Sequence, residues 1–249
     1  MPTDVGSSNP ASRTPSAPLR DKTVVVLGSS GALGSVVLQK LVAVGARPAI
    51  VVRKPWQVER ARAALGSHPG LVAEVGSRDG EAAAGFAKGA HDALGPIEGL
   101  IAACGRFAAG PLHKAPAGQD LELFEANMLA IHNVVRAVAG PMIRRKSGKL
   151  IFVGSAAVGS EATEMALYRA SKAALHEYAS ALARELLPHG IGVALAAPTT
   201  LDTAANRAAM PTSDRSDWQS CEEVAEYLIA ACGSALGTAA EPLVRLPLG

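Results

Sequence analysis

Short apolar runs alternate with longer amphipathic stretches along almost the whole chain. The apolar runs are rich in Val, Ile, Leu and Ala and end at glycine, proline or charged residues, as is typical of buried strands. Strands are expected over residues 21–27, 47–53, 70–75, 97–105, 149–155, 189–198 and 241–247. The stretches between them carry apolar residues at helical spacing. Helices are expected over residues 35–46, 55–66, 79–94, 119–145, 168–187 and 221–231.

This alternation of strand and helix predicts one doubly wound α/β domain. Parallel strands must be joined by a crossover, which is usually a helix. We therefore expect a single Rossmann-type domain over residues 21–249, with a mostly parallel seven-stranded sheet and helices on both faces. Residues 1–20 contain four prolines, four serines and no apolar run, so they are expected to form a disordered tail.

Composition supports such a domain and argues against several classes of function. The 249 residues are 49% apolar and only 4% aromatic, which suits alanine-rich helices packed closely on a buried sheet. A net charge of +2 without a long basic run argues against a nucleic-acid partner, and no apolar run approaches the length of a membrane span. Cys104, Cys221 and Cys232 show neither a disulfide framework nor zinc spacing, so we expect a cytoplasmic protein without a metal.

A glycine-rich turn lies between the first expected strand and the first expected helix. Glycines there let the backbone turn tightly, approach a pyrophosphate and aim a helix N-terminus at it. In the first βα unit, such a turn predicts a dinucleotide site. The residues expected to contact the dinucleotide at this turn are Gly28, Ser29, Ser30, Gly31, Leu33 and Gly34.

The end of the second strand indicates which dinucleotide binds. NAD sites usually place an acidic residue there for the ribose 2′-hydroxyl, whereas an arginine accommodates the 2′-phosphate of NADP. This chain has Arg53 and Lys54, and no carboxylate follows until Glu59. NADPH is therefore the expected cofactor, and NADH is less favoured. Glu74, at the third strand, and Gly105, after the fourth, are also expected to contact it.

Tyr168 and Lys172 lie four residues apart, so both side chains leave the same face of the helix expected over residues 168–187. A nearby ammonium favours the phenolate and lowers the pKa of a tyrosine, which suits the phenol to acid–base catalysis. Ser155 ends the preceding strand, where its hydroxyl is able to hydrogen-bond a carbonyl oxygen. These three residues are the candidate catalytic groups.

Taken together, these residues resemble the short-chain dehydrogenase/reductase family from about residue 22 to the C-terminus. The resemblance rests on the glycine turn, on Ser155 thirteen residues before Tyr168, and on Lys172 four residues after it. It implies that NADPH delivers hydride to a carbonyl carbon. Tyr168 would then protonate the oxygen, Ser155 would polarise it, and Lys172 would hold the ribose and lower the tyrosine pKa.

The resemblance extends to three further positions. Asn127, within the helix expected over residues 119–145, matches a catalytic asparagine that holds a water. Pro198 and Thr203 match a Pro-Gly-x-x-x-Thr loop whose threonine contacts the nicotinamide carboxamide. The family also implies a homodimer or homotetramer formed through the helices expected over residues 119–145 and 168–187.

Some positions depart from the usual family pattern. Leu27 stands where threonine is usual, Cys104 lies in Ala-Ala-Cys-Gly where Asn-Asn-Ala-Gly is usual, and Thr199 replaces a glycine. The sequences at 28–35 and 200–218 resemble the quinonoid dihydropteridine reductase branch. That branch has alanine at the serine position and an acidic end to its second strand, unlike this chain. The branch similarity is therefore interpreted as ancestry rather than as substrate.

The polar loop over residues 199–218 is expected to form a substrate lid near the nicotinamide. The candidate substrate contacts are Phe107, Met165, Leu201 and Trp218, with packing against the body as the alternative for each. His132 and His176 are expected to be packing or interface residues. No pair of histidines shows metal-ligand spacing.

Three functions are consistent with these features. The favoured one is an NADPH-dependent carbonyl reductase that acts on a small or ring-bearing ketone or aldehyde. The second is a quinonoid dihydropteridine or imine-type reductase, for which the Ser155 hydroxyl is dispensable. The third is a non-catalytic NADP(H)-binding sensor or scaffold, against which the presence of four catalytic-type groups argues.

Overall fold

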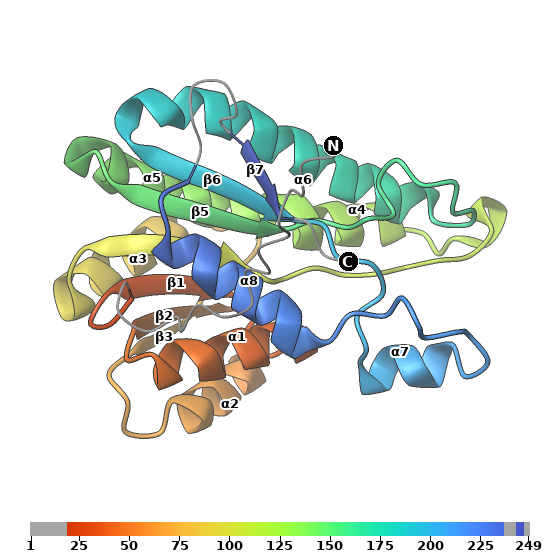
Figure 1. The fold of residues 1–249 in the computed structure, drawn as a ribbon, viewed down its shortest axis with the longest axis horizontal. Coiled ribbons are helices and arrows are strands. Elements are labelled where there is room, and N and C mark those ends of the chain that lie inside the picture. Colours follow the sequence, from red (N-terminus) through yellow and green to blue (C-terminus); the bar gives the residue numbers. More distant parts are fainter. Residues whose placement is uncertain (1–18, 237–242, 247–249) are drawn as a thin grey trace, which may run out of the picture.

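Seven parallel strands form one sheet through the middle of the molecule (Figure 1). The computed structural model describes residues 19–236 and 243–246, so the predicted tail over residues 1–20 lies outside the described residues except for its last two. The strand order is β3-β2-β1-β4-β5-β6-β7, and each neighbouring pair is parallel. The strands are β1 Thr23–Leu27, β2 Arg47–Val52, β3 Leu71–Glu74, β4 Ile97–Ala102, β5 Gly148–Val153, β6 Ile191–Ala196 and β7 Leu243–Leu246.

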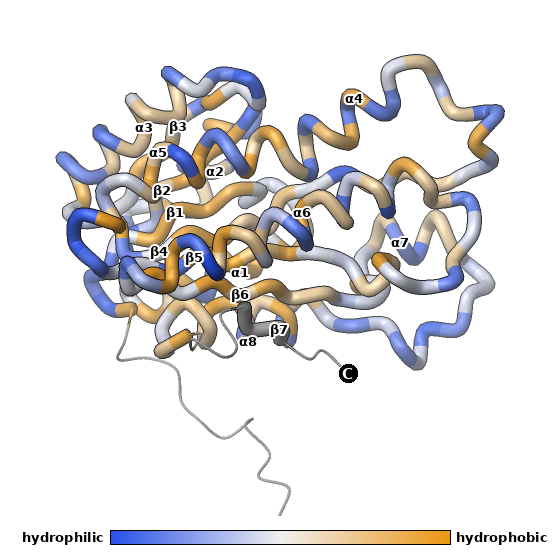
Figure 2. The backbone as a smooth tube through the Cα atoms, turned by 90° about the horizontal axis from the view of Figure 1, so that it is seen from above, coloured by the Kyte–Doolittle hydropathy of each residue, from blue (hydrophilic) through white to orange (hydrophobic). Residues whose placement is uncertain are grey.

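Helices cover both faces of the sheet, because the strands are apolar on both sides. In β1, Val25 and Leu27 pack into a layer formed with α3, α5 and α6, whereas Val24 and Val26 pack against α1 and α8. In Figure 2 the hydrophobic colour runs along the strands. The helices are α1 Ala32–Ala43, α2 Pro55–Leu65, α3 Gly80–Leu94, α4 Gln119–Phe124, α5 Ala130–Arg145, α6 Ala166–Leu186, α7 Ala204–Ala209 and α8 Cys221–Gly233. The predicted doubly wound Rossmann-type fold is confirmed.

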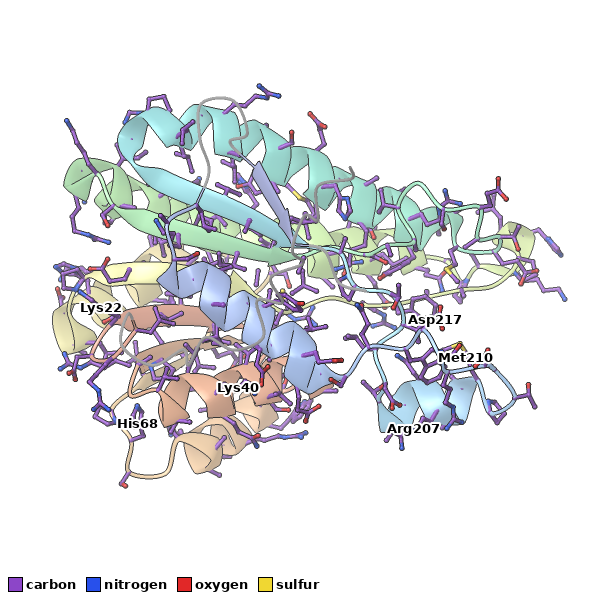
Figure 3. All side chains as sticks on the ribbon, viewed as in Figure 1. Lys22, Lys40, His68, Arg207, Met210 and Asp217 are labelled. Atoms are coloured by element: carbon purple, nitrogen blue, oxygen red, sulfur yellow. The ribbon has the colours of Figure 1, made fainter. Side chains whose placement is uncertain are left out.

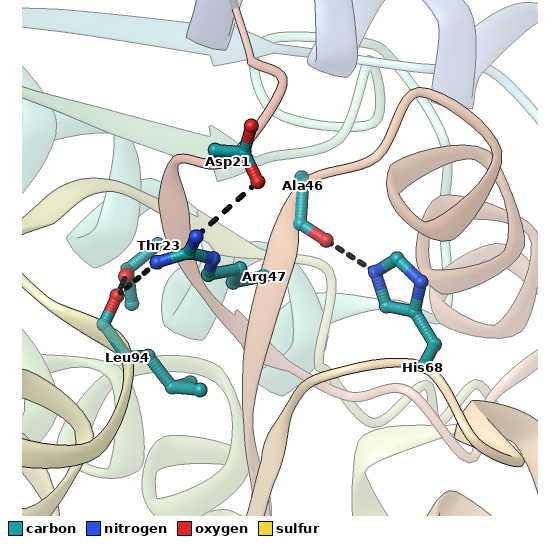
Figure 4. A network of polar contacts seen from close by, with 6 residues as sticks. All are labelled: Asp21, Thr23, Ala46, Arg47, His68 and Leu94. Carbon is teal, nitrogen blue, oxygen red and sulfur yellow. Dashed lines mark hydrogen bonds and ion pairs between the residues drawn. The ribbon is translucent and has the colours of Figure 1, made fainter.

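The amino-terminal end of the sheet is closed by a polar network (Figure 4). Arg47 pairs with Asp21 at 3.2 Å and donates to the carbonyl of Leu94 at 3.4 Å. The buried hydroxyl of Thr23 donates to the same carbonyl at 2.7 Å. These contacts tie β1 and β2 to the end of α3, at the edge of the sheet opposite to the carboxyl ends. Ligands of open α/β sheets bind at the carboxyl ends, beside the point where the strand order reverses, which here lies between β1 and β4.

Two predicted elements differ from those observed. The helix expected over residues 119–145 consists of α4, a π-helical turn over Glu125–Leu129, and α5. The polar loop expected over residues 199–218 contains the short helix α7, which the hydroxyl of Thr203 caps by accepting from the backbone N–H of Asn206. The spacing of apolar residues along the chain predicts neither a π-helical turn nor a helix as short as α7.

Candidate active site

The glycine turn between β1 and α1 is shaped by close backbone contacts. Gly28 adopts a φ of +90°, and a Cβ added to it would lie 2.7 Å from the backbone of Cys104, which follows β4. A Cβ on Gly34 would overlap the carbonyl of Gly28. Only glycine fits at either position, so the turn approaches both α1 and the end of β4 closely. Gly31 is the N-cap of α1 and donates to the carbonyl of Gly28 at 3.0 Å.

A hollow lies beside this turn, at the carboxyl ends of β1, β2, β3 and β4. Of the predicted cofactor residues, its walls include Gly28, Ser30, Gly31, Arg53 and Gly105. Leu33 instead packs in the core, and Glu74 is exposed on the last residue of β3. The walls also include residues that the sequence did not single out: Gln57, Val75 and Gly76. Ser29 is buried, and its hydroxyl has no hydrogen-bond partner within the described part of the chain.

Gln57 joins the glycine turn to the end of β2. Its Oε1 accepts from the backbone N–H groups of Arg53 and Lys54, at 2.9 and 3.0 Å. Its Nε2 donates to Ser30 Oγ at 2.6 Å. Gln57 holds this place because it is the third residue of α2, whose first residue is Pro55. That offset from the proline is a signal that sequence analysis could have used.

A second, open hollow adjoins the first and is lined by Arg53, Lys54 and Arg78 together with Glu81 and Glu125. Arg78 makes an ion pair with Glu125, in the π-helical turn. The Arg53 and Lys54 side chains are exposed, and no ion pair involves either one among residues 19–236 and 243–246. Two such cations near the glycine turn would be able to bind a phosphate group.

Ser155 and Tyr168 meet at the carboxyl end of β5. The Ser155 hydroxyl lies close enough to the phenol to act on its pKa, and Ser155 itself is buried. Burial raises the pKa of Tyr168 above its ordinary value, and the Ser155 hydroxyl opposes that shift. The prediction that Lys172 lowers the tyrosine pKa is therefore not met, because burial dominates and the ammonium is bound elsewhere.

Lys172 is buried and donates from Nζ to the carbonyl of Val153 at 2.9 Å. Burial lowers the pKa of Lys172 to about 8, although the thiol of Cys104 acts in the opposite direction. Gly105 lies against this group, since a Cβ there would be 3.2 Å from Lys172 Nζ. The ammonium thus reaches the end of β5 next to the cofactor hollow.

Asn127 is fully buried in the π-helical turn between α4 and α5. Its Oδ1 accepts from the Arg106 backbone N–H at 2.7 Å, and its Nδ2 donates to the Arg106 carbonyl at 3.0 Å. Nδ2 also donates to Ser171 Oγ at 2.8 Å, and that hydroxyl donates to the carbonyl of Tyr168 at 2.7 Å. Asn127 therefore ties the loop after β4 to α6, the helix that carries Tyr168. π-helical turns occur often at functional sites.

The predicted substrate contacts are placed unequally. Phe107 lies edge-on against the ring of Tyr168, with centroids 4.9 Å apart, and its side chain is 56% exposed. Met165 is the N-cap of α6, three residues before Tyr168. Leu201 forms a backbone bridge with Gln219, and Trp218 lies 5.4 Å from the guanidinium of Arg215 in the same loop.

The loop after β6 is pinned at its base and extended at its tip. The carbonyl of Pro198 accepts from the N–H of Ala156 at 2.9 Å, which joins the ends of β5 and β6. Gln219 pairs with Thr200 and Asp202 through its backbone, at 2.9 and 2.8 Å. Beyond this base, α7 lies away from the body, with Arg207 and Met210 labelled in Figure 3.

The described residues indicate neither a metal site nor a membrane-spanning helix. No cluster of three or more potential metal ligands occurs among them. The helices of the described ranges include none long and apolar enough to cross a membrane. The cysteines Cys104, Cys221 and Cys232 are free thiols.

Comparisons with known proteins agree on one family. A family model described as short chain dehydrogenase matches residues 22–214. The chain is 29% identical over 189 residues to a 2,3-dihydro-2,3-dihydroxybenzoate dehydrogenase of Bacillus subtilis, covering 74% of this chain and 72% of that protein. It is 27% identical over 192 residues to a 3-oxoacyl-(acyl-carrier-protein) reductase of Mycobacterium tuberculosis, covering 77% and 74%.

Solved structures show the same fold. A short-chain type dehydrogenase/reductase from Mycobacterium ulcerans superposes with a TM-score of 0.78 at 20% identity, covering 91% of this chain and 88% of that one. A dehydrogenase/reductase from Sinorhizobium meliloti superposes with a TM-score of 0.75 at 24% identity, covering 91% and 94%. At these identities the likeness concerns architecture, which matches the parallel sheet described above.

Proposed function

This chain belongs to the short-chain dehydrogenase family and is an oxidoreductase, and on that premise we propose that it is an NADPH-dependent carbonyl reductase. Its substrate would be a small or ring-bearing ketone or aldehyde. The observation that carries the proposal is the Ser155 hydroxyl beside the Tyr168 phenol, on whose helix the buried Lys172 follows four residues later. A proton donor and a polarising hydroxyl would then act on one carbonyl oxygen.

The residues of the hollow fit a dinucleotide. The Gly28 cradle leaves no room for a Cβ, the α1 N-terminus opens into the turn, and the buried Ser29 hydroxyl lacks a protein partner among the described residues. Arg53 borders both hollows, which favours the 2′-phosphate of NADPH over the free ribose of NADH. The bound dinucleotide would supply the hydride.

The chain's own groups would then act on the carbonyl oxygen. Tyr168 gives its phenolic proton to that oxygen while the carbonyl carbon receives the hydride, and Ser155 polarises the same oxygen by donating a hydrogen bond. Lys172 holds the nicotinamide ribose. Asn127 fixes the loop after β4 and keeps a water near α6 through which Tyr168 is reprotonated.

Substrate specificity would arise around Tyr168. Phe107 packs against the ring of Tyr168, and Met165 caps α6 three residues before it. Leu201 and Trp218, in the loop at residues 199–218, would contact the substrate from that loop. Thr203, at the start of α7, would contact the nicotinamide carboxamide. We further propose a cytoplasmic homodimer or homotetramer formed through α4, α5 and α6.

The proposal is tested by binding followed by turnover. NADPH and NADH are titrated separately into the full-length chain, and absorbance of the reduced nicotinamide is then followed with a panel of ketones, aldehydes and quinonoid dihydropterin. Tighter binding of NADPH than NADH, with turnover of ketones or aldehydes, is the expected result. Binding without turnover of any carbonyl compound would favour the sensor or scaffold function instead.

The panel also separates the second candidate, a quinonoid dihydropteridine or imine-type reductase. Quinonoid chemistry does not require a hydroxyl that polarises a carbonyl, so such an activity would survive Ser155→Ala. Ketone reduction should fall on this substitution by roughly a hundredfold, the scale of one lost oxyanion-type donor. Retained pterin turnover in Ser155→Ala, with no ketone turnover in the native chain, would overturn the carbonyl-reductase proposal.

A further inference from the structure

Three side chains on one stripe of α6 reach the carboxyl end of β5. Tyr168, Lys172 and His176 follow one another at intervals of four residues, so they lie on the same face of the helix. Tyr168 contacts the Ser155 side chain, and Lys172 donates to the carbonyl of Val153 at 2.9 Å. His176, which sequence analysis assigned to packing or an interface, completes the series one turn further along.

His176 accepts the backbone N–H of Ser155. The distance from Ser155 N to His176 Nε2 is 3.2 Å. Here β5 ends: the N–H of Gly154 still donates to the carbonyl of Ala196 in β6, at 2.7 Å, and the next N–H turns to the imidazole instead. Ser155 is buried, and a buried N–H without a partner is costly, so this bond fixes the peptide that carries the catalytic hydroxyl.

The imidazole of His176 packs against Gly154, directly after β5, near Leu195 in β6. A Cβ on Gly154 would overlap His176 Nε2, and it would lie 3.0 Å from a methyl group of Leu195. The ring therefore occupies the space that a side chain at position 154 would fill. Because a backbone N–H only donates, Nε2 is the acceptor in this bond.

We propose that His176 is a positioning residue that sets the place and orientation of Ser155. This inference rests on the proposed function, because the serine hydroxyl is the group that polarises the carbonyl. The three side chains contact the carbonyl of Val153, the backbone N–H of Ser155 and the Ser155 side chain. These contacts hold the phenol, the ammonium and the serine hydroxyl in one relative geometry. His176 would act through Ser155 rather than on the cofactor or substrate.

The test compares His176→Ala, His176→Gln and the native full-length chain. His176→Ala removes the acceptor, and kcat for carbonyl reduction should fall about tenfold while the NADPH Kd stays within twofold. His176→Gln offers an amide oxygen to the same N–H and should recover most of the lost rate. Amide hydrogen exchange at Ser155, followed by nuclear magnetic resonance, should speed up at least about tenfold in His176→Ala and slow again in His176→Gln.

His132→Ala is the matched control, because its imidazole also hydrogen-bonds α6, to the Tyr178 hydroxyl at 3.0 Å, but away from Ser155. It should leave kcat and Ser155 exchange as in the native chain. Unchanged Ser155 exchange in His176→Ala, or an equal loss of kcat in both alanine variants, would overturn the proposal. If the native chain reduces no carbonyl compound, the proposed function fails, yet the exchange comparison still decides whether His176 holds Ser155.

Discussion

The two halves of the sheet build their parts of the site in different ways. In the half formed by β1, β2 and β3, the hollow is shaped by backbone: Gly28 approaches the end of β4, and Gln57 links the turn to β2 through main-chain N–H groups. In the half formed by β5, β6 and α6, buried polar side chains such as Ser155 and Lys172 are each bound to a protein partner. Under the proposed function, the first half would receive the dinucleotide and the second would hold the reacting groups in place.

This difference separates binding from chemistry. Changes in the β1–β3 half should alter cofactor affinity and leave the bound complex reactive. In the β5–α6 half, changes of Ser155 or Tyr168 should alter the rate and leave cofactor affinity almost intact, whereas a change of Lys172, which is proposed to hold the ribose, should also weaken cofactor binding.

The largest effect is expected for Tyr168→Phe. The substitution removes the proton donor and keeps the ring that packs against Phe107, so kcat should fall by roughly a hundredfold to ten-thousandfold. The NADPH Kd, measured by calorimetry, should stay within twofold. Tyr178→Phe, on the same helix, is the control and should keep its rate. Turnover near the native level in Tyr168→Phe would place the acid elsewhere.

Gly28→Ala should act on binding instead. The φ of +90° is strained for alanine, and its Cβ would lie 2.7 Å from the Cys104 backbone, so the turn must open. NADPH affinity should fall about a hundredfold, with hydride transfer from the saturated complex little changed. Gly66→Ala also places alanine at a positive φ, of 56°, but in open space. That control should lose stability and keep affinity, which separates strain from the shape of the site.

Arg53→Ala should weaken NADPH binding about tenfold and leave NADH binding unchanged, because a charge-assisted contact to the 2′-phosphate is lost. Arg60→Ala, an exposed cation on α2 outside both hollows, is the matched control. The readout is the ratio of the two dissociation constants. An equal loss for both dinucleotides would show that Arg53 does not discriminate between them.

The smallest effect concerns Lys172 and stability. The folded pKa of about 8 lies below the ordinary value of 10.5, so the unfolded chain binds more protons between these pH values. The free energy of unfolding therefore rises with pH across that window, and the cost of burying the ammonium is complete below pH 8. Lys172→Met removes this cost of about 3 kcal/mol but leaves the Val153 carbonyl without its donor.

Lys172→Met should consequently be more stable than the native chain by about 1–2 kcal/mol at pH 7, although inactive, and the gain should shrink toward pH 10.5. Urea unfolding at several pH values measures it. Lys40→Met, which removes an ammonium paired with Glu226 on the surface, is the control for the loss of a lysine outside the site. A destabilised Lys172→Met at every pH would mean that the ammonium stabilises the fold.

Much of the fold could be predicted because its signals are local. Buried strands such as residues 47–53 and 149–155 show as unbroken apolar runs, and Gly28 and Gly34 mark a turn that only glycine can form. The π-helical turn around Asn127 and the helix α7 left no such signal. The first is set by contacts between Asn127, Arg106 and Ser171, and the second by a single hydroxyl cap.

The sequence indicated which residues belong to the candidate site, but it did not indicate the contacts that they make. The spacing of Tyr168 and Lys172 indicated a shared helix face, and the structure has them on one face of α6. The raised pKa of Tyr168 was not predictable, because it depends on how deeply the ring is buried. The bond from Ser155 to His176 joins residues 21 apart and requires the actual packing of α6 on β5.

The most direct test of the account follows the hydride itself. NADPH that carries deuterium at both hydrogen positions of the reactive carbon of its nicotinamide ring is incubated with the full-length chain and a ketone from the panel. The product is then analysed by mass spectrometry. The account predicts one deuterium at the former carbonyl carbon for each NADPH oxidised. NADPH that is not consumed with any ketone or aldehyde, or an alcohol product without deuterium, would contradict it.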